Sequence, residues 1–356
     1  MTENSEKKTV LRRQADVLCP VCLDYITWRE TPLYERIVRE GKWREVSLDR
    51  INNPIKRADL RSTCYIKCPN PAQDTSEHYL PVTYRDHGDP IVVGLVGSHK
   101  AGKTHLLATM IHEALGGGLD RYGITVEPAD EIRHKAFQTG QIERLLSGLE
   151  LHGTGEGITT FAEMLLVRSR GESRPLVFFD VAGEDFTRND GGRRARFLLG
   201  VTALMFIEDP AQRIPALRAN GETKADVDVG NQYFTAALRR IQALPRMREL
   251  PATIVLTKSD QLRYQHPVDT WLRREIPAEG VRAEDFLAES SDVYAFLAQY
   301  GADSTLGVYD KFAKCTLHFV SATGVAADGG TYPRGIRPAR VLQPLVALLA
   351  MVGVLD

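Results

Sequence analysis

From residue 91 onward, short apolar runs alternate with longer segments that suit helices. The runs, rich in β-branched residues, are 91–96, 161–167, 176–180, 201–207, 253–257 and 317–320. Most of them lack a polar/apolar alternation, which is typical of strands buried on both faces of a largely parallel sheet. The helix-compatible segments are 103–115, 129–149, 231–244, 283–300 and 340–351. This alternation predicts right-handed crossovers and a doubly wound α/β sheet.

Residues 1–90 have a different pattern. They are charged, show little apolar periodicity and are interrupted by Pro and Asn, as at Asn52-Asn53-Pro54. We therefore predict an N-terminal module at 1–90 and a larger domain at 91–356. The polar residues 1–14 do not resemble a signal peptide. The apolar stretch 345–355 is too short to cross a bilayer, so the sequence predicts a soluble protein of the cytoplasm with no membrane span.

Composition narrows the classes of function. The chain has 356 residues, of which 43% are hydrophobic and 26% charged, and this favours a globular protein over a disordered one. A formal net charge of −1 gives no electrostatic footprint for nucleic acid or for an acidic membrane surface. Four of the five cysteines form two close pairs, which favours metal ligation in a reducing compartment over a disulfide scaffold.

A phosphate-binding loop follows the first apolar run. The octad Gly97-Ser98-His99-Lys100-Ala101-Gly102-Lys103-Thr104 fits G-x-x-x-x-G-K-[ST] and stands between a predicted strand and a predicted helix. Its glycines permit a tight turn in which successive N–H groups surround phosphates at a helix N-terminus. Lys103 is expected to bridge the β- and γ-phosphates, and the Thr104 hydroxyl to ligate Mg²⁺. The loop predicts a nucleoside triphosphate site.

Three further motifs follow in order, each after a predicted strand. Asp180 and Gly183 form D-x-x-G, with Asp180 expected to hold Mg²⁺ and the Gly183 N–H to meet the γ-phosphate. Thr257, Lys258 and Asp260 form T-K-x-D, and the Asp260 carboxylate can accept two hydrogen bonds from guanine that adenine cannot supply. Ser321 and Ala322 begin an S-A-x loop whose Ala322 N–H is expected to meet guanine O6.

With these four motifs, the chain from about residue 91 to its end resembles the translation-factor/Ras-like class of P-loop GTPases. The resemblance implies a mostly parallel six-stranded sheet and a GTP/GDP switch. Within that class, the N-terminal cysteine pairs and long insertions resemble the bacterial double-GTPase type, whose members are thought to act in multi-component conflict or signalling systems. A paired GTPase or another protein partner is therefore expected.

The switch regions depart from the family pattern. Thr159 and Thr160, with Thr154 further back, are the candidates for the switch I threonine that ligates Mg²⁺ and meets the γ-phosphate. Glu184 stands where Ras-like proteins carry a water-orienting glutamine, so we expect Glu184 to act on the attacking water or hydrolysis to be weak. An arginine run follows in the expected switch II and suggests either a cis arginine finger or a solvated docking face. Its members are Arg188, Arg193, Arg194 and Arg196.

The cysteine pairs are Cys19–Cys22, spaced C-x2-C, and Cys64–Cys68, spaced C-x3-C. Two sulfurs from each short loop suit one tetrahedral structural zinc ion, and the first pair resembles a zinc-ribbon knuckle. The alternatives are four ordinary reduced cysteines, or substitution by His78 or His87, which otherwise suit surface positions. The aromatic residues of this module (Tyr25, Trp28, Tyr34 and Trp43) favour packing around the metal over a stacking platform for nucleic acid.

The sequence thus predicts a Mg²⁺-dependent GTPase switch with a zinc-ribbon-like module that docks on a protein partner. Two alternatives stay open: a GTP-dependent scaffold that does not hydrolyse its nucleotide, and a nucleotide-regulated zinc protein that binds nucleic acid.

Overall fold

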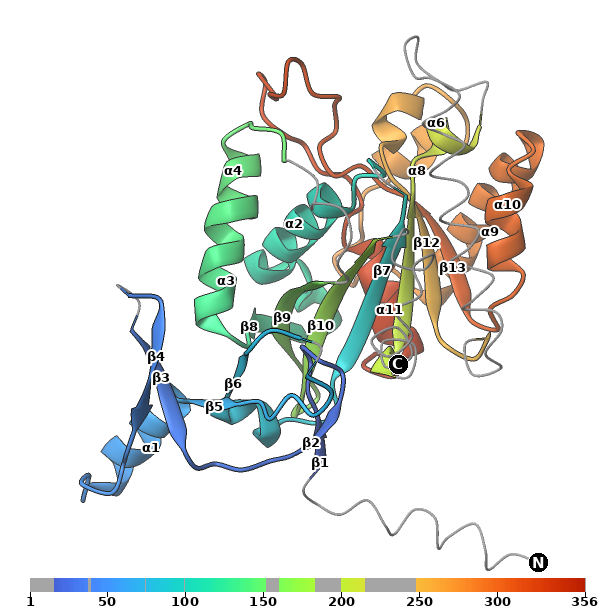
Figure 1. Cartoon of the computed structure of the whole chain (residues 1–356). Coiled ribbons are helices and arrows are strands. Elements are labelled where there is room, and N and C mark those ends of the chain that lie inside the picture. The colour runs from blue at the N-terminus through green and yellow to red at the C-terminus, as the bar shows by residue number, and fades with distance from the viewer. Residues whose placement is uncertain are drawn as a thin grey trace, which may run out of the picture.

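The computed structural model describes residues 16–37, 40–73, 75–98, 100–151, 160–182, 200–214 and 248–355 (Figure 1). Its centre is a seven-stranded sheet with the order β13-β12-β11-β7-β10-β9-β8. Five neighbouring strands, from β13 to β10, run parallel, whereas β9 is antiparallel to both β10 and β8. The strands are β7 (Ile91–Gly97), β8 (Ile124–Pro128), β9 (Thr160–Ser169), β10 (Glu172–Ala182), β11 (Ala203–Glu208), β12 (Ala252–Leu256) and β13 (Cys315–Phe319).

The expectation of six strands was wrong by one. The additional strand, β8, pairs with β9 at the edge of the sheet. Its residues alternate in burial, beginning with buried Ile124 and exposed Thr125, and so do not form an unbroken apolar run. This half-exposed pattern is what an edge strand shows when only one face is covered.

Helices cover both faces of the sheet. Alternate residues of its strands point to opposite faces, and both sets of residues are apolar and buried. Val92 and Val96 of β7 belong to a core with α8, α9 and α10, whereas Ile91, Val93 and Leu95 belong to a second core with α2 and α11. The helices are α2 (Lys103–Glu113), α3 (Glu131–Phe137), α4 (Glu143–Leu146), α6 (Pro210–Arg213), α8 (Val268–Arg273), α9 (Ala283–Gln299), α10 (Asp303–Tyr309) and α11 (Gln343–Met351). A π-helical turn at Gln138–Ile142 joins α3 to α4. The helix expected at 231–244 lies outside the described residues.

The N-terminal residues form two small antiparallel sheets. One has the order β4-β3-β5-β6 and the other is the β1-β2 hairpin. Helix α1 begins after Asn53, whose side chain accepts hydrogen bonds from the N–H groups of Ile55 and Lys56, with Pro54 at its first position. These elements are β1 (Asp16–Leu18), β2 (Tyr25–Thr27), β3 (Leu33–Ile37), β4 (Lys42–Val46), α1 (Pro54–Ser62), β5 (Tyr65–Lys67) and β6 (Tyr79–Pro81).

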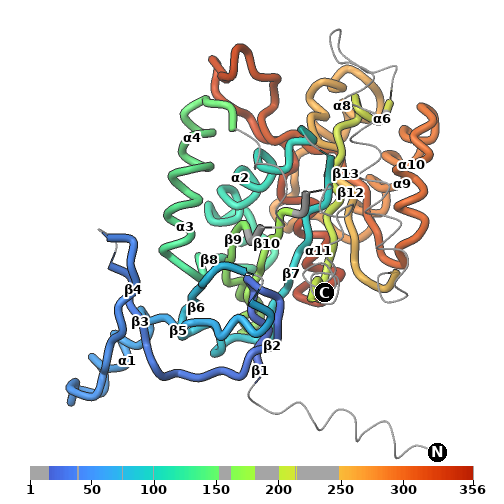
Figure 2. Tube along the Cα trace, in the orientation of Figure 1, coloured from blue at the N-terminus to red at the C-terminus, as the bar shows by residue number. Residues whose placement is uncertain are grey.

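The N-terminal elements pack against the large sheet. Leu18, Ile26 and Val82 share one apolar core with strand residues of the large sheet, and the Tyr65 hydroxyl donates to the Asp130 carboxylate at 2.9 Å. Figures 1 and 2 show this module near one end of the sheet. The loop that joins β7 to α2 and the loop that follows β13 lie away from it. A domain boundary at residue 90 stays a prediction. No helix among the described residues has the length and apolar character that a membrane span requires.

Candidate functional site

The loop between β7 and α2 has the backbone that its glycines predict. A Cβ atom on Gly97 would lie 2.4 Å from the Ile207 carbonyl oxygen on the neighbouring strand, so only glycine fits there. Gly102 has a φ of +86°, in the left-handed region that favours glycine, and α2 begins at the next residue. The unpaired N–H groups at the start of an eleven-residue helix therefore face the loop and suit an anion.

Lys103 and Asp180 lie together at the carboxyl ends of β7 and β10. The Lys103 ammonium donates to the Gly97 carbonyl oxygen at 2.9 Å and lies 3.8 Å from Asp180 Oδ1. Both side chains are largely buried. Lys103 and Thr104, the first two residues of α2, line a cavity that opens beside the phosphate loop. This end of the site therefore combines an ammonium group, a carboxylate and a hydroxyl, which are the groups that bind phosphate and a hard cation.

The T-K-x-D segment follows β12 and packs against the phosphate loop. The Thr257 hydroxyl lies 2.6 Å from the Ala101 carbonyl oxygen and 2.9 Å from that of Glu208. Lys258 has a left-handed φ of +52°, and its ammonium donates to the buried Asp209 carboxylate at 2.7 Å. The lysine stem is thereby fixed beside the cavity.

Asp260 is held by the S-A-x loop beyond β13. The Ser321 hydroxyl donates to Asp260 Oδ1 at 2.6 Å and accepts from the Gly324 N–H at 2.8 Å. Asp260 is only 8% exposed, and with Ala322 it lines the cavity that also contains Lys103. The structure therefore brings together motifs that lie more than 150 residues apart in the chain.

A buried ion pair lies next to the S-A-x loop and is connected to it through the backbone. Ser321 and Ala339 exchange backbone hydrogen bonds of 3.0 and 2.8 Å, and the next residue, Arg340, donates to Glu289 Oε2 at 2.6 Å. His318 of β13 lies 2.8 Å from the same carboxylate oxygen. Burial alone raises the pKa of Glu289, but His318 and Arg340 outweigh it and hold that pKa below its ordinary value.

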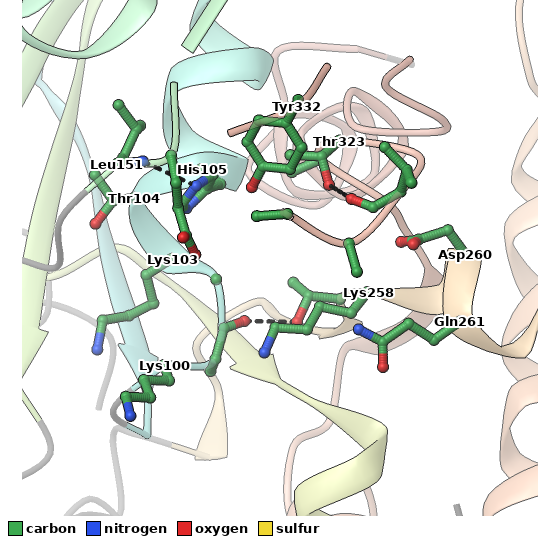
Figure 3. Close-up of a pocket in the computed structure, with 18 of the residues that line it drawn as sticks. Lys100, Lys103, Thr104, His105, Leu151, Lys258, Asp260, Gln261, Thr323 and Tyr332 are labelled. Atoms are coloured by element: carbon green, nitrogen blue, oxygen red, sulfur yellow. Dashed lines mark hydrogen bonds between the residues drawn. The ribbon is translucent and has the colours of Figure 1, made fainter. Parts of the chain in front are cut away.

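The cavity has a volume of about 550 Å³ (Figure 3). Besides the predicted motifs, it is lined by residues that the sequence did not indicate, among them His105, Glu150, Leu151 and Tyr332. His105 adjoins the phosphate-loop motif and was within reach of prediction. Tyr332 is far along the chain, and no spacing signal marks it.

Several predicted residues lie outside the described part of the chain. They are His99, Thr154, Thr159, Gly183, Glu184 and the four arginines from Arg188 to Arg196. Thr160 is the first residue of β9, and its side chain is not described. The assignments of these residues to the switch regions stay predictions.

The N-terminal module contains a second candidate site, formed by Cys19, Cys22, Cys68 and His78. Their possible ligand atoms all lie within 4.8 Å of one another, and all four residues are buried. Cys68 Sγ lies 3.8 Å from Cys22 Sγ and 3.7 Å from Cys19 Sγ, while His78 Nε2 lies 3.2 Å from Cys19 Sγ. This cluster could hold a metal ion.

Backbone groups orient these donors. The Val21 N–H donates to Cys19 Sγ and the Asn70 N–H to Cys68 Sγ, each at 3.4 Å. His78 Nδ1 lies 2.8 Å from the Ser76 carbonyl oxygen, which directs Nε2 toward the sulfurs. The pKa of Cys68 is lowered to about 4 by its hydrogen bonds with Cys19 and Cys22, whereas burial raises the pKa of Cys19.

The structure corrects the predicted role of Cys64. Its thiol donates to the Leu60 carbonyl oxygen at 3.1 Å and is not part of the cluster. The extended strand β5 separates Cys64 from Cys68, and four steps at about 3.3 Å each place their Cα atoms ~13 Å apart. His78 takes the fourth position because it precedes β6, which pairs with β5. His87 lies elsewhere, with Nδ1 at 2.8 Å from Ser173 Oγ.

Comparison with known proteins identifies one family. The sequence model of the family described as Double-GTPase 2 matches residues 91–306, which is more than half of the chain. The match includes the phosphate loop, Asp180 and the T-K-x-D segment, and it ends before β13. No curated protein matches the chain.

Proposed function

Since the chain belongs to the Double-GTPase 2 family, we propose that it binds GTP with Mg²⁺ and hydrolyses it to GDP and phosphate. The observation that carries this proposal is a single cavity with a phosphate-binding loop at one end and Asp260 with Ala322 at the other. The carboxylate accepts from guanine N1–H and the exocyclic amine, and an adenine base leaves it unsatisfied. Residues 97–104 surround the phosphates, and the Lys258 stem lies along the base.

Thr104 lines the cavity, and Asp180 Oδ1 lies 3.8 Å from the Lys103 ammonium. These two residues fit a magnesium ion because they offer a hydroxyl and a carboxylate oxygen beside the phosphate loop. Held by these two residues, such an ion would supply positive charge against the β- and γ-phosphates. Lys103 exchanges its bond to the Gly97 carbonyl for the phosphates, so its charge is already at the site before nucleotide arrives. We assign the switch I role to Thr159 or Thr160, the γ-phosphate contact to the Gly183 N–H and the orientation of water to Glu184.

We further propose that the Cys19–Cys22–Cys68–His78 cluster holds a structural Zn²⁺ ion and that the module docks on a protein partner in the reducing cytoplasm. Three sulfurs and one imidazole make a closed tetrahedral set with no open position for catalysis. Protein docking is favoured over nucleic acid because the module's aromatic rings pack on one another. The Trp43 ring stacks on Tyr79 at 4.0 Å, and Trp28 stacks on Tyr84 at 6.2 Å.

A single-turnover measurement of GDP formed from Mg²⁺-GTP, beside Mg²⁺-ATP, tests the proposed reaction. Conversion of GTP alone is expected. GTP that is bound but stays intact, with and without added partner proteins, favours the scaffold alternative and removes Glu184 from catalysis. Equal turnover of ATP contradicts the assignment of Asp260.

Two variants test the two ends of the cavity. Lys103→Ala is expected to abolish nucleotide binding, while Lys314→Ala, which removes an exposed lysine just before β13, leaves binding unchanged. Asp260→Asn is expected to weaken GTP binding and to admit xanthine nucleotides. Unchanged GTP affinity in either site variant contradicts the corresponding assignment.

A further inference from the structure

One wall of the cavity is formed by two segments that are bonded to each other through their backbones. The Tyr332 N–H donates to the Gly148 carbonyl oxygen at 2.7 Å, and the Glu150 N–H donates to the Gly330 carbonyl oxygen at 2.9 Å. Leu149 and Thr331 lie between these bonds as an antiparallel bridge. We call residues 148–151 and 330–332 the clamp. It connects the chain after α4 to the long loop between β13 and α11.

The close approach of the two segments requires a glycine. Gly148 has a φ of +84°, and a Cβ atom on it would lie 3.0 Å from the Tyr332 carbonyl oxygen. His105 of α2 ties the clamp to the phosphate loop, because its Nε2 accepts from the Leu151 N–H at 3.2 Å. Burial lowers the pKa of His105 and so favours the neutral ring that this bond needs.

Tyr332 is the large side chain of the clamp that lines the cavity. It is 6% exposed, and its ring meets the His105 ring edge-to-face at 6.2 Å between centroids. Figure 3 shows Tyr332 and His105 across the cavity from Lys258 and Asp260. Burial and the nearby Glu150 carboxylate raise the pKa of Tyr332 to about 12, so its hydroxyl stays a hydrogen-bond donor.

The position of the clamp limits what it can contact. Phosphates occupy the end at Gly102 and Lys103, and guanine occupies the end at Asp260 and Ala322, so the nucleoside sugar and the base edge lie between them. His105, Glu150, Leu151 and Tyr332 also line the cavity. We propose that Tyr332 contacts the nucleoside part of the bound nucleotide and that the clamp holds this part in place. The inference rests on the proposed function. None of the clamp residues belongs to the four motifs, and Tyr332 also lies beyond the family match, which ends at residue 306.

A contact to the nucleoside has a distinctive signature. GDP and GTP share the nucleoside and differ only at the γ-phosphate, so loss of the Tyr332 ring weakens both by the same factor. A residue that senses the γ-phosphate changes their ratio instead. If Tyr332 is purely structural, its loss lowers the stability of the unliganded protein. If Tyr332 contacts the nucleoside, its loss lowers mainly the stability that the protein gains when nucleotide is added.

The experiment measures equilibrium affinity and dissociation rate for GDP, for a non-hydrolysable GTP analogue and for ADP, using the full chain. Tyr332→Ala is expected to weaken GDP and the GTP analogue roughly tenfold or more, equally for both, and to speed dissociation. Tyr332→Phe keeps the ring and stays nearer to wild type. Tyr309→Ala is the matched control, because Tyr309 is a half-buried tyrosine of α10 that packs on Tyr294.

A second pair of variants keeps the test valid if Tyr332→Ala does not fold. Gly148→Ala places a methyl group against the Tyr332 carbonyl oxygen and so disturbs the clamp. Gly301→Ala is the control, because Gly301 has a similar left-handed φ of +69° but open space around its Cβ position. Weaker nucleotide binding in Gly148→Ala alone supports the inference. Wild-type affinity in folded Tyr332→Ala, or equal losses in both glycine variants, overturns it. A wild-type chain that binds ADP as well as GDP overturns the proposed guanine specificity and leaves the clamp to be judged on ADP. Binding of neither nucleotide overturns both.

Discussion

Single substitutions in the N-terminal module can decide between two candidate metal ligands. Cys64 is the ligand that sequence spacing predicts, and His78 is the one that the structure places in the cluster. Cys64→Ser removes a thiol that bonds to the Leu60 carbonyl oxygen and lies outside the cluster of ligand atoms found among the described residues. His78→Ala removes one of four clustered donors. We expect the Cys64→Ser protein to keep one Zn²⁺ per chain and the His78→Ala protein to lose it on dialysis against a weak chelator.

The magnitude follows from the geometry. Zinc–sulfur bonds of about 2.3 Å at tetrahedral angles separate two sulfurs by about 3.8 Å. In the structure, Cys68 Sγ lies 3.7 Å from Cys19 Sγ and 3.8 Å from Cys22 Sγ. Two of the sulfur–sulfur separations therefore already suit the ion, and all four ligand atoms lie within 4.8 Å of one another. Structural zinc binds with about 10–16 kcal/mol at neutral pH. Shared over four donors, the loss of one costs about 3 kcal/mol, or roughly a hundredfold in affinity.

Zinc content per chain by elemental analysis, together with a competition titration against a chromogenic chelator, measures this difference. Unfolding followed by circular dichroism serves as a second readout, because a metal ion in this cluster would connect the β1-β2 hairpin to the β5-β6 pair. Loss of zinc from Cys64→Ser with retention in His78→Ala would refute the ligand assignment. A zinc-free wild-type protein purified without chelator would refute the site.

Two further predictions concern ionisable residues that pack around the large sheet. Burial lowers the pKa of His105 below its ordinary value of 6.5, so between these two pKa values the unfolded chain binds more protons than the folded one. The contribution of His105 to the stability of the folded state is therefore complete above pH 6.5 and is lost as the pH falls. His105→Gln should remove this part of the pH dependence, as measured by denaturant unfolding. Arg340→Met leaves the Glu289 carboxylate buried without its arginine, although His318 and the Phe319 N–H still bond to it. A loss of about 3 kcal/mol is therefore expected in the free energy of unfolding. Adding Glu289→Leu should recover part of it, and a loss below about 1 kcal/mol in the single variant contradicts the role of this ion pair.

The phosphate loop was predictable because its requirements are local. A turn with a left-handed Gly102, a close approach at Gly97 and a helix starting at Lys103 all lie within one octad, so the residue types reveal the structure. The parallel strands were predictable for a related reason. Both faces of β7 are buried, and a strand of this kind is an apolar run in the sequence.

The fourth metal donor and the clamp were not predictable because pairing between distant segments decides them. The register Lys67 to Tyr79 in the β5-β6 pair brings the residue before Tyr79 beside Cys68, whereas spacing alone favoured Cys64. Tyr332 reaches the cavity through its backbone bond to Gly148, 184 residues earlier in the chain. Strand β8 was missed because its alternate residues are exposed and a helix pattern follows it directly.

Strand β8 also has a consequence for how a partner can bind. An edge strand offers unpaired N–H and C=O groups on which another chain can build a further strand. Here β8 occupies the outer side of β9, so the strand after the predicted switch threonines already has both neighbours in the sheet. The new edge is five residues long and ends in Pro128, which has no N–H to donate. On this side of the sheet a partner therefore cannot add a strand to β9, and strand addition would have to use the short edge of β8.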